Sequence, residues 1–231
     1  MSKVVLDAAH FDSKARQWDT NPVFRERAAR IAAAIRNRIP LNQSMTALDY
    51  GSGTGLLAFL LKDALGHITL MDSSAGMLAV AAEKIESQGV SNMTLRQVDL
   101  SADPPADETY DLICTAMTLH HIPDTAHILQ VFQRLLKPGG WLAVADLDRE
   151  DGSFHGPEVD VHHGFEREAL AALAQMAGFT DIAFATVFEI EKDIDGQTRR
   201  YPVFLMTARA TEGDHQAYTE YSEVLPASPG P

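Results

Sequence analysis

The sequence predicts an α/β fold with a doubly wound, mostly parallel sheet that closes with an antiparallel hairpin strand. Short apolar runs alternate with helix-periodic segments between residues 45 and 146, which is typical of a parallel sheet covered by helices on both faces. Two β-rich runs separated by an Asp-Gly pair follow near the end of the chain. Of the 231 residues, 45% are hydrophobic, which is enough for one large core.

The elements follow one another in a regular order. A helix is expected from Asn21, a good N-cap ahead of Pro22, as far as Pro40. The apolar runs predict strands at 45–50, 67–72, 93–99, 110–116 and 140–146. Apolar residues spaced by three and four predict helices at 56–65, 75–88, 124–136 and 165–177. The two closing strands are expected at 180–190 and 201–210, with a hairpin turn at Asp195-Gly196.

We divide the chain into three parts. Residues 1–40 are expected to form a helical lid and residues 41–210 the main domain. Residues 211–231 contain four acidic residues and no Lys or Arg, and they end in Ala-Ser-Pro-Gly-Pro, so we expect a disordered acidic tail.

The composition excludes several classes of partner. With 19 Lys and Arg against 32 Asp and Glu, the net charge of −13 argues against nucleic acid. No apolar run reaches the roughly 20 residues that cross a bilayer, and the first residues lack the pattern of a signal peptide. The single cysteine, Cys114, fits a reducing compartment. We therefore expect a cytoplasmic monomer or homodimer without a membrane or nucleic-acid partner.

A glycine-rich turn joins the run 45–50 to the helix 56–65, in the block ALDYGSGTG. Glycines let the backbone approach a ligand closely, and open α/β sheets bind ligands at the carboxyl ends of their strands. A dinucleotide-binding fingerprint would need glycine at position 56, but this chain has leucine there. Asp49 would repel a diphosphate and attract an ammonium or sulfonium group. The turn therefore favours S-adenosylmethionine over NAD.

Two more carboxylates follow the next strands. Asp72 ends the run 67–72, where it can accept both hydrogens of a ribose diol. Asp99 ends the third run, where it can accept a hydrogen bond from an adenine amino group, and Met77 can pack on the adenine ring. Three aspartates at successive strand ends predict an adenosine-binding pocket.

These blocks, together with LRQVDL and YDLICTAMTLHHIPD, resemble the class I S-adenosylmethionine-dependent methyltransferases of the small-molecule type. The resemblance covers roughly residues 10–210 and implies a seven-stranded Rossmann-like sheet with one antiparallel strand. It implies methyl transfer to an O, N or S atom of a small-molecule acceptor, with S-adenosylhomocysteine as the product. With the residue arguments above, the expected cofactor-binding residues are Trp18, Asp49, Gly51, Ser52, Gly53, Gly55, Asp72, Ser73, Met77, Asp99, Leu100, Thr115 and Ala116.

Methyl transfer from a sulfonium carbon succeeds largely by alignment, so a catalytic base is useful only where the acceptor must lose a proton. Histidine suits that role, and the candidates are His120, after the fourth strand, and His163, in a loop that could cover the substrate. His155 and His163 with nearby acids could bind a metal, but their spacing matches no standard ligand pattern, so no metal is expected.

Two features leave alternatives open. Phe11 and Trp18 could close over the cofactor, or they could only dock the first helices on the core. The pocket also allows a non-catalytic relative that binds the cofactor and serves as an interaction subunit, and, less readily, an NAD-dependent oxidoreductase.

Overall fold

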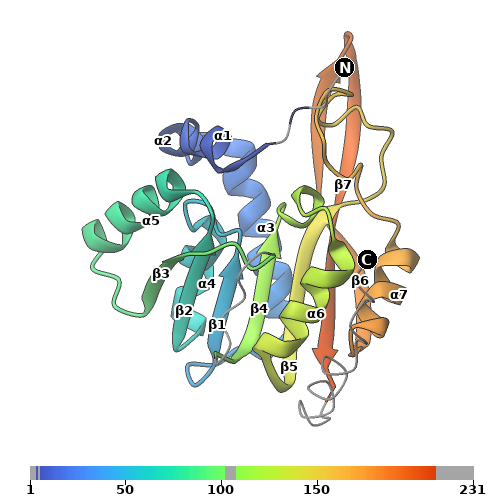
Figure 1. Ribbon diagram of the computed structural model, residues 1–231. Helices are drawn as coiled ribbons and strands as arrows, with labels where there is room; N and C mark the ends of the chain where they lie inside the picture. The colour runs from blue at the N-terminus through green and yellow to red at the C-terminus, as the bar shows by residue number, and fades with distance from the viewer. Residues whose placement is uncertain (1–3, 5, 102–107, 212–231) are drawn as a thin grey trace, which may run out of the picture.

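The computed structural model describes residues 4, 6–101 and 108–211. Seven strands form one sheet in the order β3-β2-β1-β4-β5-β7-β6, and only β7 runs antiparallel to its neighbours (Figure 1). The strands are β1 (Thr46–Tyr50), β2 (His67–Asp72), β3 (Met93–Gln97), β4 (Tyr110–Ala116), β5 (Leu136–Leu147), β6 (Phe179–Ile194) and β7 (Gln197–Ala210). The predicted fold class is confirmed.

Helices cover both faces of this sheet. They are α1 (Ala8–Asp12), α2 (Ala15–Trp18), α3 (Pro22–Arg38), α4 (Leu56–Leu61), α5 (Ala75–Ser87), α6 (Thr125–Leu135) and α7 (Arg167–Met176), with short 3-10 turns at Lys62–Ala64 and Leu119–His121. Buried side chains of α3, α4 and α5 pack on one face, and those of α6 and α7 on the other. In β1, Ala47 faces the first of these cores and Leu48 the second, so the strand is buried on both sides. No helix in the described part of the chain is long and apolar enough to cross a membrane.

Side-chain hydrogen bonds attach the first two helices to the rest of the domain. Asp12 Oδ1 accepts from Ser74 Oγ at 2.5 Å and from the Gly76 amide at 2.7 Å. Asp19 receives Lys84 Nζ at 2.6 Å and Thr54 Oγ1 at 2.5 Å. These bonds place α1 and α2 above the carboxyl ends of β1 and β2 (Figure 1).

The closing hairpin is longer than predicted. Its turn lies at Asp195-Gly196, as expected, where both residues have positive φ angles of 54° and 75°. The paired strands reach the turn itself and extend beyond the sheet edge (Figure 1). The charged run around the turn resembles a loop in sequence, but Glu191 lies opposite Arg200 and accepts from its Nε at 3.1 Å. Cross-strand pairs of opposite charge favour this pairing.

Candidate functional site

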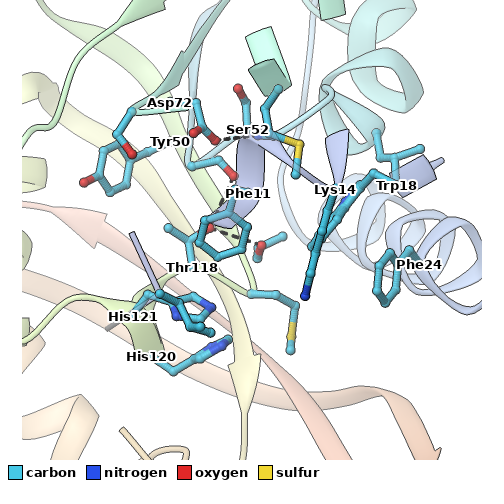
Figure 2. A pocket seen from close by; sticks show the side chains of 18 of the residues that line it. Phe11, Lys14, Trp18, Phe24, Tyr50, Ser52, Asp72, Thr118, His120 and His121 are labelled. Atoms are coloured by element: carbon cyan, nitrogen blue, oxygen red, sulfur yellow. Dashed lines mark hydrogen bonds between the residues drawn. The ribbon is translucent and has the colours of Figure 1, made fainter. Parts of the chain in front are cut away.

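A cavity of about 1050 Å³ opens at the carboxyl ends of β1, β2, β3 and β4. The sheet order reverses between β1 and β4, which is where open α/β sheets bind ligands. Side chains from α1, α2 and α3 form the opposite wall, and the tip of β6 closes one side. Figure 2 shows Ser52 and Asp72 on one side of this space and His120 and His121 on another.

The glycine turn shapes the floor of the cavity. Gly51 and Gly53 have positive φ angles of 63° and 53°. A Cβ atom on Gly51 would lie 2.3 Å from Cγ2 of Thr118, so only glycine lets the turn approach the end of β4 this closely. The Gly53 amide donates a 2.7 Å hydrogen bond to Asp72 Oδ2, which ties the turn to β2.

Three carboxylates line the cavity at the ends of β1, β2 and β3. Asp49 is 1% exposed, and its burial raises the pKa of the carboxyl to about 7. Burial also raises the pKa of Asp72, although the amides of Gly53 and Ser74 bind its two oxygens. Asp99 is exposed, and its Oδ1 accepts from the amide and hydroxyl of Ser101 at 3.0 and 2.6 Å. The arrangement matches the predicted set of strand-end acids.

Unsatisfied polar atoms gather around the same space. The described residues contain four buried side-chain polar atoms without a hydrogen-bond partner: Asp49 Oδ2, Ser52 Oγ, Thr115 Oγ1 and His121 Nδ1. Asp49, Ser52 and His121 line the cavity, and Thr115 lies in β4 beside it. Buried polar atoms are rarely left unpaired, so their concentration here indicates a ligand site.

A histidine cluster lies across the cavity from the strand-end acids. Asp146 accepts from His120 Nδ1 at 2.7 Å, which directs Nε2 of that ring toward His155 Nε2 at 3.1 Å. Burial alone would raise the pKa of Asp146, but the charge and hydrogen bonds of His120 and the Leu147 amide lower it below its usual value. Burial and the neighbouring histidines lower the pKa of His121 to about 3, and burial, His120 and Lys192 lower that of His155 to about 4. His121 and His155 are therefore neutral at physiological pH.

Nitrogen atoms of His120, His121 and His155 lie within 4.8 Å of one another, a separation that three metal ligands can have. This group differs from the set that the sequence suggested. Only His155 is common to both, because His163 packs against Gly152 elsewhere in the loop.

The aromatic residues of the first helices face the cavity. Phe11 contacts His121 edge-on with ring centroids 5.4 Å apart, and Trp18 lies against Phe24 at 4.6 Å. All four residues line the cavity, so the docking of α1 and α2 and the covering of the cavity use the same side chains.

Most of the residues expected from the sequence line the cavity, namely Trp18, Asp49, Gly51, Ser52, Gly53, Asp72, Ser73, Met77, Asp99, Ala116 and His120. Four others lie outside its wall. Gly55 begins α4 with a φ of 82° and lets the turn pass Leu70, while Leu100 and Thr115 are buried in the core. His163 is part of the 150–164 loop, and its carbonyl accepts from the Glu150 amide.

Sequence reasoning missed several lining residues. Lys14, Arg27 and Lys192 come from three separate segments, and no motif connects them. Tyr50 and Thr118 flank the recognised motifs, where proximity alone could have suggested them.

Comparisons with known proteins agree with this geometry. A family model described as a methyltransferase domain matches residues 41–197. This chain belongs to that family. The match confirms the predicted class I S-adenosylmethionine-dependent methyltransferase relationship.

Two curated relatives illustrate the range of methyltransferases that this domain resembles. An uncharacterised methyltransferase of Schizosaccharomyces pombe is 30% identical over 63% of this chain and 52% of its own length. A ubiquinone/menaquinone biosynthesis C-methyltransferase of Cellvibrio japonicus is 34% identical over 50% of this chain and 48% of its own length. This chain thus spans about half the length of the curated relatives that it matches.

Two solved methyltransferase structures share the fold. A phosphoethanolamine N-methyltransferase of Haemonchus contortus, in complex with phosphomonomethylethanolamine and S-adenosylhomocysteine, has a TM-score of 0.66 and 18% identity. The match covers 78% of this chain and 52% of that one. The N-methyltransferase NodS of Bradyrhizobium japonicum, bound to S-adenosylhomocysteine, has a TM-score of 0.63 and 17% identity over 84% of this chain and 90% of that one.

Proposed function

We propose that this protein binds S-adenosylmethionine and transfers its methyl group to an O, N or S atom of a small-molecule acceptor. The observation that carries the proposal is the cavity beside the glycine turn, where strand-end acids and unpartnered polar atoms meet. When bound, S-adenosylmethionine supplies a methyl group on a positively charged sulfur. The unpartnered Asp49 Oδ2 fits a ligand that carries positive charge.

The cofactor-binding residues have distinct tasks in this proposal. Asp49 accepts from the ammonium group of the cofactor. Asp72 keeps lone pairs for a ribose diol, because each of its oxygens accepts only one of the backbone bonds at 2.7 and 2.8 Å. Asp99 is close to the Tyr50 hydroxyl and accepts from Ser101 with Oδ1, and a remaining lone pair accepts from an adenine amino group while Met77 packs on the ring.

His120 is the candidate base for an acceptor that must lose a proton. It is 2% exposed, and its Nδ1 is held by the ionised Asp146, so a proton from the acceptor would go to Nε2. Such carboxylate–imidazole pairing fixes the tautomer and stabilises the imidazolium that forms. His163 lies outside the cavity wall and has no comparable position.

Residues 1–40 act as a lid in this proposal. Phe11 and Trp18 exclude water from the sulfonium carbon, and the Asp12 and Asp19 contacts keep the lid closed on α5. We propose that the protein works in the cytoplasm on a free metabolite.

Isothermal titration with S-adenosylmethionine, S-adenosylhomocysteine and NAD tests the cofactor assignment. Micromolar binding of the first two without NAD binding supports it, and the reverse pattern would refute it. Incubation with labelled S-adenosylmethionine and a metabolite extract then tests catalysis. Cofactor binding without any labelled product would favour the non-catalytic alternative.

A further inference from the structure

Three cationic side chains line one end of the cavity. Arg27 comes from α3, Lys192 from the tip of β6, and Lys14 from the link between α1 and α2. Figure 2 draws Lys14 and Trp18 on the same side of the space. This concentration of positive charge is notable in a chain with a net charge of −13.

No ion pair satisfies these three side chains among the residues that the structure describes. The guanidinium carbon of Arg27 lies 4.9 Å from the ring centroid of Phe24. Lys192 Nζ donates to the Phe154 carbonyl at 2.7 Å and lies 3.8 Å above the Phe154 ring. Lys14 is exposed at the cavity mouth. Arg27 and Lys192 are half-buried, and a half-buried cation without a counter-ion costs free energy.

The carboxylates near Arg27 and Lys192 already accept hydrogen bonds from other groups. Asp146 attracts Arg27 electrostatically, but its oxygens accept from the ring and amide of His120 and from the Leu147 amide. Glu150 attracts Lys192, while one of its oxygens accepts from the amides of Gly152 and Phe154. Burial lowers the pKa of Arg27 to about 10, which leaves it charged at neutral pH.

The cavity therefore has two ends of opposite charge. Arg27 and Lys192 are close enough for each to act on the other's surroundings and both line the cavity, whereas the carboxylates near them, Asp146 and Glu150, lie outside its wall. Asp49 and Asp72 are likewise close to each other, and both line the cavity. The acidic end lies at β1 to β3, and the basic end adjoins the histidine cluster. A ligand at the basic end would pair with guanidinium and ammonium groups.

We propose that the methyl acceptor carries an oxyanion, a carboxylate or a phosphate monoester, that binds between Arg27 and Lys192 with Lys14 at the entrance. This inference deepens the proposed methyltransferase function and rests on it. Arginine binds both oxyanions through two parallel hydrogen bonds, and the Lys192 ammonium group adds a further charge-assisted donor. The anionic group thereby holds the acceptor by one end, so that its nucleophilic atom points past His120 toward the cofactor. The oxyanion is not the methylated group.

Calorimetric titration of benzoate and inorganic phosphate tests this site directly. Each anion is added to the protein alone and to the protein loaded with S-adenosylhomocysteine, in about 150 mM NaCl to suppress loose surface binding. We expect wild-type protein to bind at least one of the two, and the preferred anion identifies the carboxylate or the phosphate. Arg27→Gln and Lys192→Met should each weaken that binding about tenfold or more.

Arg25→Gln is the matched control, because Arg25 is an exposed arginine of the same helix outside the cavity wall. It should leave anion binding unchanged, and all three variants should bind S-adenosylhomocysteine within about twofold of wild type. Absence of anion binding by wild-type protein, or equal losses in Arg25→Gln and Arg27→Gln, would overturn the proposal. Tight zinc binding at the histidine cluster without anion binding would overturn it as well.

The cofactor and anion results separate the two proposals. Anion binding without S-adenosylhomocysteine binding would refute the proposed function and leave the anion site standing. Cofactor binding without anion binding would refute the anion site and leave the proposed function standing. In the metabolite assay, the labelled product should be retained by an anion-exchange resin at neutral pH, and a labelled product in the neutral or cationic fraction would contradict the assignment.

Discussion

Replacing Asp49 with asparagine should stabilise the cofactor-free protein at neutral pH while weakening its affinity for S-adenosylhomocysteine. Asp49 is buried beside β2, its Oδ2 has no partner, and its pKa is about 7 instead of 3.8. At a pH between these two values, the folded protein therefore keeps the Asp49 proton, whereas the unfolded chain has lost it. Because unfolding then releases a proton, raising the pH favours the unfolded state.

The pH dependence sets the magnitude. One pKa unit corresponds to about 1.4 kcal/mol, and Asp49 is half titrated at pH 7, so the wild-type protein loses roughly 2 kcal/mol of stability through Asp49 between pH 5 and pH 7. The loss is complete about one pH unit above 7, and it disappears below pH 3.8. The asparagine side chain does not ionise. The stability difference between Asp49→Asn and wild type should therefore grow by roughly 3 kcal/mol from pH 5 to pH 8.

Urea unfolding of both cofactor-free proteins at pH 5, 6, 7 and 8 measures this difference. Glu86→Gln, at an exposed site on α5, is the control and should follow the wild-type pH profile within about 0.5 kcal/mol. If the stability of Asp49→Asn and of wild type changed with pH in the same way, the raised pKa of Asp49 would be refuted. Calorimetry in buffers of different ionisation enthalpy adds a second readout, because an ammonium ligand should release a proton from Asp49 near pH 7.

Three further substitutions test other parts of the site. Asp72→Ala should raise the dissociation constant for S-adenosylhomocysteine about 10- to 150-fold, and wild-type affinity would refute the ribose assignment. Gly51→Ala should lower the free energy of unfolding by more than the roughly 1–2 kcal/mol of left-handed backbone strain, because the new Cβ would collide with Thr118. The same collision should weaken the affinity for the cofactor. Gly89→Ala is the control, because Gly89 also has a positive φ angle but its added Cβ would meet no atom within 4 Å. Urea unfolding of this variant should show only the cost of backbone strain. His120→Ala should lower the maximal methyl-transfer rate about 100-fold or more while cofactor affinity is retained, and an unchanged rate would remove His120 as the base.

The central sheet could be predicted because local patterns determine it. The run 45–50 reads as a strand buried on both faces, and the glycines after it signal the turn that follows. The same reasoning placed acids at the ends of β1, β2 and β3, since the carboxyl ends of parallel strands meet at one edge. Leu100 follows this pattern in sequence but turns into the core, because the chain leaves β3 at Gln97.

The acceptor end of the cavity could not be predicted, because it depends on long-range packing. Lys192 reaches the cavity only because the β6–β7 hairpin continues past the sheet edge, and its charged residues resemble a loop in sequence. Arg27 interrupts an otherwise amphipathic helix, where an exposed position is the usual expectation. The contact between His155 and His120 joins residues 35 positions apart and depends on the fold of the 150–164 loop.

The distribution of charge links the two ligands of the proposed reaction. Asp49 Oδ2 lacks a hydrogen-bond partner at one end of the cavity, and Arg27 and Lys192 form no ion pair with the described residues at the other, so both ends are costly without a ligand. A ligand that carries positive charge would offset the first cost, and an anionic acceptor the second. Because Phe11 and Trp18 line the same space, the lid closure proposed above would remove water from both ligands and strengthen both pairings. Binding of S-adenosylhomocysteine and of the anion should therefore be mutually favourable, and by linkage each should raise the affinity of the other by the same factor.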